Sequence, residues 1–183
     1  MKPEPNRYSW SCILLGLLLL TGCAVPQRFW PQKDMVGVDL DAIPGERIVL
    51  IVSRDTEYKR LLVAELQKLL ASEQIPHHTM GIQQLEEIDT AGYSAVVVIN
   101  TCLAWGLDHD VRTFLDRQQT TANIILLTTS GEGSWLPDMR EHDFDAMSGA
   151  SVKANVENVA QELMARVQTK LERAASTSKG PLQ

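Results

Sequence analysis

Residues 47–52, Arg-Ile-Val-Leu-Ile-Val, begin with one charged side chain and continue as an unbroken run of large apolar ones. A strand with one face in water alternates apolar and polar residues, so this run predicts a strand buried on both faces. Two later stretches share the pattern: Ser-Ala-Val-Val-Val-Ile at 94–99 and Ile-Ile-Leu-Leu-Thr at 124–128. Such strands occur almost only in parallel sheets that helices cover on both sides. The three stretches therefore predict an α/β fold.

The segments between these strands have the apolar spacing of helices. A first helix is expected to open near Glu57, a second to span residues 108–117, and a third to begin near Ser151. In the first helix one face is apolar and the charged residues lie elsewhere. The apolar face consists of Leu62, Leu66, Leu69 and Leu70, and the charged residues are Lys59, Glu65, Lys68 and Glu73. The apolar face of the last helix consists of Val156, Val159, Ala160, Leu163, Val167 and Leu171.

Two weaker strands complete the pattern, at residues 76–80 and 144–147, and a short helix is expected at 82–88. Strand and helix then alternate five times between residues 47 and 173. Because βαβ units are right-handed, this alternation predicts a three-layer, doubly wound parallel sheet of about five strands. The order 2-1-3-4-5 is expected for five strands. Residues 174–183 are predicted to be a polar tail.

Ligands of such sheets bind beyond the carboxyl ends of the strands, where the strand order reverses. The loops expected there are residues 53–56, 100–106, 130–135 and 148–151.

The content of these loops resembles that of flavodoxins. Ser53 and Thr56 lie on the first loop, Trp105 on the second and Trp135 on the third. The resemblance implies FMN, with its phosphate on the first loop and its ring between the two tryptophans. However, the first loop lacks glycine and brings Asp55 to where a phosphate would approach. The alternative is structural: Thr56 or Asp55 caps the following helix, and the tryptophans pack on the loops.

A second resemblance involves Ser148-Gly149-Ala150-Ser151. It is similar to the Ser-Gly-Ala-Thr type of motif at which some exported proteins carry FMN through a phosphoester on the final hydroxyl. That resemblance implies Ser151 as the attachment point. The alternative is a strand-to-helix turn, in which Gly149 permits a tight bend and Ser151 caps the last helix.

No catalytic residues and no metal site are predicted. His77 and His78 are adjacent on an expected strand and therefore point to opposite faces. Cys102 and His109 would pair only if their loop folded back. Cys102 itself has three interpretations: a buried apolar group, a reactive thiol or an intermolecular partner. A non-catalytic function is favoured, and enzymatic activity stays open.

The N-terminus has the three zones of an export signal. Positive charge at Lys2 and Arg7 precedes an apolar run at 13–20, which is too short to span a bilayer. The sequence Leu20-Thr21-Gly22-Cys23 then resembles the lipobox of bacterial lipoproteins. The resemblance implies removal of residues 1–22 and attachment of acyl chains such as palmitate to Cys23. The alternatives are an ordinary secretory signal and a retained membrane anchor.

Ala24 rather than Asp follows the lipobox cysteine. The resemblance therefore implies the outer membrane of a Gram-negative cell, with the domain facing the periplasm. Residues 23–46 contain several prolines and glycines and are predicted to be a lipidated tether with a reach of roughly 25 Å. Cys12 leaves with the signal, so Cys102 is the remaining thiol.

The chain has a formal net charge of −6, which excludes an electrostatic attraction to nucleic acid or anionic lipid. Taken together, these features predict a lipid-anchored envelope domain that binds a partner, with the envelope protein unidentified. The alternative is an FMN-binding electron-transfer or reductase domain anchored in the periplasm.

Overall fold

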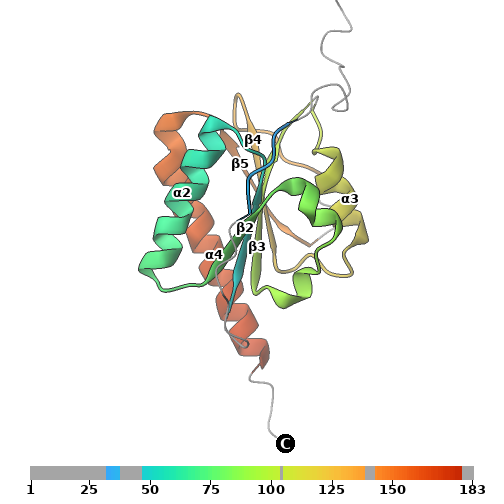
Figure 1. The fold of residues 1–183 in the computed structure, drawn as a ribbon, viewed down its shortest axis with the longest axis vertical. Helices are drawn as coiled ribbons and strands as arrows, with labels where there is room; N and C mark the ends of the chain where they lie inside the picture. Colours follow the sequence, from blue (N-terminus) through green and yellow to red (C-terminus); the bar gives the residue numbers. More distant parts are fainter. Residues whose placement is uncertain (1–31, 38–46, 104, 139–142, 179–183) are drawn as a thin grey trace, which may run out of the picture. The chain divides into compact units, whose positions relative to one another are not determined.

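A five-stranded parallel sheet forms the centre of the computed structural model, which describes residues 32–37, 47–103, 105–138 and 143–178 (Figure 1). The order of the strands is β2-β1-β3-β4-β5, which confirms the predicted fold class and strand order. The strands are β1 (Val49–Ser53), β2 (His77–Met80), β3 (Ala95–Thr101), β4 (Ile124–Ser130) and β5 (Asp145–Ala150).

Helices cover both faces of the sheet. On one face α2 (Glu57–Ser72) packs beside α4 (Val156–Ser178), and on the other lie α3 (His109–Arg117) and the 3-10 helix η3 (Ile82–Glu86) (Figure 1). Two shorter 3-10 helices are η4 (Thr90–Gly92) and η5 (Lys153–Asn155). The three layers are those that the sequence predicts.

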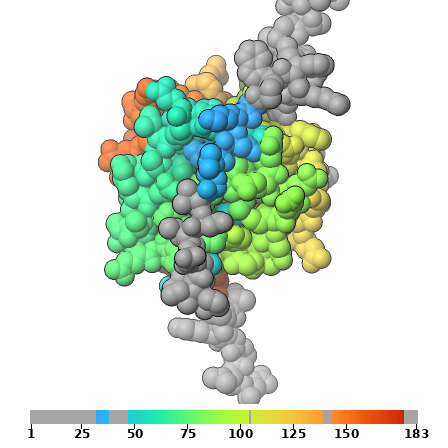
Figure 2. Space-filling view, viewed as in Figure 1, coloured from blue at the N-terminus to red at the C-terminus, as the bar shows by residue number. Residues whose placement is uncertain are grey.

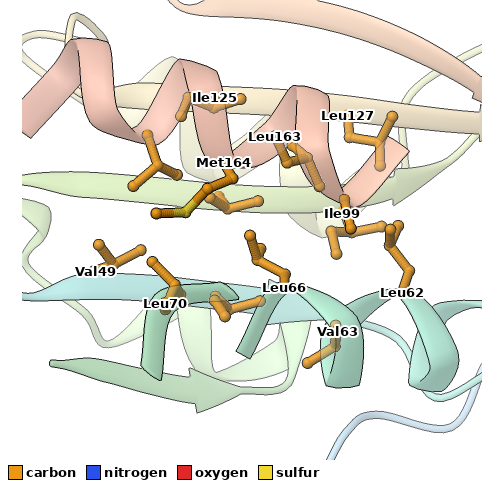
Figure 3. Close-up of a cluster of buried hydrophobic side chains, with 14 of the residues drawn as sticks. Val49, Leu62, Val63, Leu66, Leu70, Ile99, Ile125, Leu127, Leu163 and Met164 are labelled. Atoms are coloured by element: carbon orange, nitrogen blue, oxygen red, sulfur yellow. The ribbon is translucent and has the colours of Figure 1, made fainter. Parts of the chain in front are cut away.

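The continuous apolar run of β1 is explained by these two helix layers. Val49 and Ile51 face the cluster formed with α2 and α4, whereas Leu50 and Val52 face the cluster formed with α3 and η3. All four side chains are inaccessible to solvent. Figure 3 shows the first cluster, in which Leu66 of α2 and Leu163 of α4 lie over the strands.

The last strand and the last helix differ from their predicted bounds. β5 continues to Ala150, so Ser148 and Gly149 lie within the strand and pair with Thr128 and Thr129. β5 lies at an edge of the sheet and is only partly buried, which explains why its sequence lacks an apolar run. α4 begins at Val156 and continues to Ser178, past the start of the predicted polar tail at residue 174. Ala174 and Ala175 favour this continuation, because alanine has the highest helix propensity.

Residues 32–37 are attached to the domain, although they lie within the predicted tether of residues 23–46. Asp34 forms an antiparallel bridge with Arg54. The Met35 N–H donates to the Ser53 carbonyl (3.3 Å), and the Asp55 N–H donates to the Lys33 carbonyl (2.6 Å). Figure 2 shows this segment, in blue, on the surface of the domain. The rest of the predicted tether, the lipobox and the signal lie outside the described residues.

None of the helices among the described residues combines the length and the apolar character that crossing a membrane requires.

The loop after β4 packs closely on the carboxyl end of β5. Gly133 has a φ of +72°, and its N–H donates to the Ser130 hydroxyl (2.8 Å). A Cβ at this position would lie 2.3 Å from the Ala150 backbone nitrogen. Glycine is therefore required here, both for the backbone angle and for the close approach.

We expect Gly133→Ala to lower the free energy of unfolding by about 2–4 kcal/mol, from strain at positive φ and from the clash with β5. Gly131→Ala is the matched control, because no atom lies within 4 Å of a Cβ placed there. Its effect should stay within about 0.5 kcal/mol. Denaturant unfolding of both variants measures the difference, and equal losses would contradict the proposed packing of this loop.

Candidate functional site at the carboxyl edge of the sheet

Arg54 lies directly after β1, where the strand order reverses, and only 5% of its surface is exposed. Its Nε and Nη2 donate to the two carboxylate oxygens of Asp108 at 3.0 and 3.2 Å. Its Nη1 donates to Asp34 (2.7 Å) and its Nη2 also donates to Asp110 (2.6 Å). One buried guanidinium therefore joins three carboxylates, which belong to the 32–37 segment and to the start of α3.

These carboxylates keep Arg54 charged despite its burial. Burial lowers the pKa of Arg54, but the hydrogen bond to Asp110 and the negative charges of Asp108 and Asp34 outweigh it and raise the pKa above its ordinary value. Asp108 is fixed in turn, because its backbone N–H donates to the buried Asn100 side chain (2.9 Å). The group links β1, β3 and α3 at their shared edge.

Asp34 holds the 32–37 segment in a narrow space. Its second carboxylate oxygen accepts a hydrogen bond from the Gln83 backbone N–H (2.8 Å). A Cβ added at Gly81 would lie 2.6 Å from the Asp34 Cβ, so only glycine leaves room for this side chain. Nearby, the carboxylate of Asp55 forms ion pairs with Lys33 (3.2 Å) and Arg60 (2.9 Å).

Lys59, on the first turn of α2, is the most unusual group at this edge. Its side chain is only 1% exposed, and its Nζ donates to the Ile99 carbonyl (3.1 Å) and to the Thr101 hydroxyl (2.7 Å). Burial lowers the pKa of Lys59 to about 7; the charges of Asp108 and Asp34 oppose this shift, and Arg54 adds to it. A substantial fraction of the Lys59 side chains is therefore neutral near pH 7.

The expectation that Lys59 lies off the apolar face of its helix is wrong. Lys59 precedes Leu62, Leu66 and Leu70 by three, seven and eleven positions, which is the spacing of a single helical face. The helical spacing that buries Lys59 was therefore visible in the sequence. Lysine, however, is charged and is almost always exposed in proteins, so this position was predicted to face solvent.

The hydroxyls of Ser53 and Thr56, which the flavodoxin resemblance assigns to a phosphate, form hydrogen bonds with neighbouring backbone groups. Ser53 is the last residue of β1; it is buried, and its Oγ donates to the Arg54 carbonyl (3.0 Å). Thr56 is the N-cap of α2 and accepts a hydrogen bond from the Lys59 N–H (3.3 Å), as the structural alternative expects.

The two tryptophans lie on the loops that the sequence assigned to them, but they differ in environment. Trp105 is 80% exposed and has a φ of +61°. Its turn is closed by reciprocal backbone hydrogen bonds between Leu103 and Gly106, at 3.2 and 3.0 Å. Trp135 is half-buried on the loop after β4. The structure thus leaves the Trp105 indole in solvent and half-buries that of Trp135.

Ser151 is exposed, and its backbone N–H donates to the Ser130 carbonyl (2.9 Å). The expectation that Ser151 caps the last helix is wrong, because η5 intervenes and begins after Val152. The tight bend expected at Gly149 is also absent from this position, since the residue continues β5.

The phosphate of FMN does not fit the first loop in this arrangement. On this loop the Asp55 N–H, which a phosphate could accept from, already donates to the Lys33 carbonyl. Arg54 is saturated by carboxylates, and Asp34 and Asp55 would repel an anion. The segment 32–37 would have to leave before a phosphate entered.

Metal binding and thiol chemistry find little support at this edge. Within the described ranges, no group of three or more His, Cys, Asp or Glu residues is arranged to hold a metal ion. Cys102 is half-buried, and burial raises the pKa of its thiol, partly opposed by the N–H groups of Trp105 and Gly106. The protonated thiol is the less reactive form.

Two hollows lie at the opposite, amino edge of the sheet. One, of about 510 Å³, includes Arg47 and Pro76, which precede β1 and β2. The other, of about 560 Å³, includes Asp89 and Asn123, which precede β3 and β4.

The strand order and the two helix layers define a flavodoxin-like α/β domain. No family model and no curated protein matches the chain.

Among solved structures, a mutant of flavodoxin from Pseudomonas aeruginosa is 13% identical, covers 68% of this chain and 99% of its own, and has a TM-score of 0.49. General stress protein 14 from Treponema denticola, in complex with FMN, is 10% identical over 68% of this chain and 99% of its own, with a TM-score of 0.44. At these values the likenesses carry no argument about the ligand of this chain, and the fold rests on its own topology.

We expect the free energy of unfolding to rise by about 2–4 kcal/mol between pH 7 and pH 10 because of Lys59. Its pKa lies near 7 in the folded protein and near 10.5 in the unfolded chain. The unfolded chain therefore binds more protons in this window, and stability increases with pH. Below pH 7 both states are protonated, and the cost of burying the charge is fully present.

Lys59→Met should flatten this pH dependence, as measured by denaturant unfolding at a series of pH values. Lys68→Met is the matched control, because Lys68 lies on the same helix with an exposed side chain. If Lys59→Met keeps the wild-type slope, the buried lysine is charged throughout, and the description of the site is wrong.

Proposed function

We propose that this protein is a lipid-anchored cell-envelope lipoprotein whose flavodoxin-like domain acts as a binding or interaction module without catalysis of its own. The observation that carries this proposal is the occupied carboxyl edge. Arg54, Lys59 and the Asp55 N–H, which sit where a ligand is expected, are all engaged by other groups of the protein. A partner would therefore bind to the outer surface of the domain.

Opening this edge for a ligand would be costly. Displacing the 32–37 segment removes the Asp34 carboxylate from a buried guanidinium, and breaking such a pair typically costs about 3–5 kcal/mol. It also removes the backbone hydrogen bond between Lys33 and Asp55 and the one between Met35 and Ser53. A cofactor with ordinary affinity would have to offset all of these losses.

The lipid anchor is supported by the lipobox at residues 20–23. The domain is engaged from Lys33 onward, so the chain leaves it close to Cys23. We place the protein at the outer membrane, facing the periplasm, because Ala24 follows the lipidated cysteine. Its partners are the membrane, through the acyl chains, and an envelope protein; the negative net charge disfavours nucleic acid.

The second candidate is an FMN-dependent electron-transfer or reductase domain. It is favoured by Trp105 and Trp135, which lie on the loops after β3 and β4. In that case Ser53 and Thr56 would have to turn to a phosphate after the 32–37 segment had left.

The visible spectrum of purified residues 24–183 separates the two candidates. We expect a colourless protein whose thermal midpoint does not change when FMN is added. Asp34→Ala, which frees the 32–37 segment, should not bind FMN either, because Asp55, Asp108 and Asp110 still oppose a phosphate. Lys153→Ala removes an exposed ion pair with Glu57 and serves as the matched control. Flavin absorbance, or an FMN-dependent midpoint that is lost in Trp105→Ala, would establish the second candidate instead.

Cys23→Ser should release the protein from membranes and block its lipid-dependent processing. Cys12→Ser is the control, since that residue lies within the predicted signal and should leave both properties intact. Fractionation and the apparent mass of the mature chain report the outcome. A Cys23→Ser protein that still sediments with membranes and is processed normally would refute the anchor.

A further inference from the structure

The exposed large apolar side chains of the described residues gather at one edge of the domain. Trp105 follows β3, Leu136 follows β4 and Val152 follows β5. Because the strands are parallel, these connections all begin beyond the carboxyl ends, at the upper end of Figure 1. Leu136 lies three residues after Gly133, which packs on the Ala150 backbone at that edge. Two more exposed side chains, Val36 and Leu61, lie on the docked segment and near the start of α2.

Among these exposed side chains, Trp105 gives the clearest indication of what this edge contacts. Its turn holds a bulky residue at a φ of +61°, a conformation that costs about 1–2 kcal/mol for a side chain other than glycine. The hydrogen bonds between Leu103 and Gly106 maintain the turn and leave the indole 80% exposed. An indole combines a large apolar surface with one N–H donor, which suits the headgroup region of a membrane.

The length of chain between the anchor and the domain brings this edge to the membrane. Asp34 fixes the 32–37 segment beside Arg54, at the carboxyl end of β1. Residues 23–31 alone separate Gln32 from the acyl chains. Fully extended, they span at most about 30 Å, and as a flexible chain roughly 16 Å. The tether is therefore much shorter than the 24 residues predicted at 23–46 suggest, and it ends at the apolar edge.

Most exposed charges at this edge are paired. Basic groups at Lys33, Arg60 and Lys153 each pair with a neighbouring carboxylate, on Asp55 or Glu57. The negative excess lies around Arg54, where three carboxylates share one guanidinium, and two of these, Asp34 and Asp108, are largely buried. Basic side chains at a membrane surface also extend their charged ends into the headgroups while their stems contact apolar groups.

We propose that the carboxyl edge is a second membrane contact, in which Trp105, Leu136 and Val152 enter the phospholipid headgroup region of the membrane that holds Cys23. This inference rests on the proposed lipid anchor. The anchor brings the domain to the surface, and the apolar edge then fixes which side of the domain faces the lipid. The amino edge, with its two hollows, faces away from the membrane.

The experiment uses the full lipidated protein in vesicles of phosphatidylethanolamine and phosphatidylglycerol. Removal of the signal leaves three tryptophans, Trp30, Trp105 and Trp135. One variant retains only Trp105 (Trp30→Phe, Trp135→Phe), and its matched partner carries its single tryptophan at the exposed Gln119 of the amino edge (Trp30→Phe, Trp105→Phe, Trp135→Phe, Gln119→Trp). Brominated phospholipids, which quench only indoles at the membrane, should quench Trp105 roughly two-fold more strongly than the amino-edge indole, with a blue shift on vesicle binding.

The outcomes separate the contact from the anchor. Equal, weak quenching of both indoles in protein that floats with the vesicles overturns the membrane contact, leaves the anchor standing and points to a protein partner for this edge. Stronger quenching of the amino-edge indole also overturns the proposed orientation. Protein that fails to float with the vesicles after its signal has been removed overturns the anchor itself.

Discussion

The buried guanidinium of Arg54 is the interaction on which the carboxyl edge of this domain depends. It reaches Asp34 across 20 residues and Asp108 across 54, so it closes loops that local structure would leave open. A buried charge is tolerated only when it is paired and hydrogen-bonded on several sides. The three carboxylates meet that requirement, and in doing so they fix the start of α3, the end of β1 and the 32–37 segment against one another.

This network also determines what the edge can do. The groups that could receive an anionic ligand are directed inward, since the Asp55 N–H donates to the Lys33 carbonyl and the Arg54 guanidinium to three carboxylates. Lys59 illustrates the result, because its amine is engaged by the Ile99 carbonyl and Thr101 rather than by a ligand. In this structure the flavodoxin-like sheet is kept, and groups of the protein itself occupy the edge at which ligands of such sheets bind.

The fold could be predicted because its signals are local. The apolar runs at 47–52, 94–99 and 124–128 identify the three central strands, since only strands covered on both faces have such sequences. β5 was underestimated because an edge strand of small and polar residues carries no such run. The loops of the candidate site were predicted for the same topological reason. The Arg54 network was not, because Asp34 lies in a segment with no regular pattern and the pairing is between distant residues.

In the lipid-anchored protein that we propose, the attachment of residues 32–37 keeps the domain close to the membrane. A protein on a long tether explores a deep layer of solution, whereas a domain attached at most about 30 Å from its acylated cysteine moves essentially within the plane of the membrane. For a partner in that same plane, confinement to a thin layer raises the effective concentration without any new contact between the two proteins. The interactions of Asp34, which hold the 32–37 segment on the domain, would thus make encounters with such a partner depend on lateral diffusion in the membrane as well as on affinity.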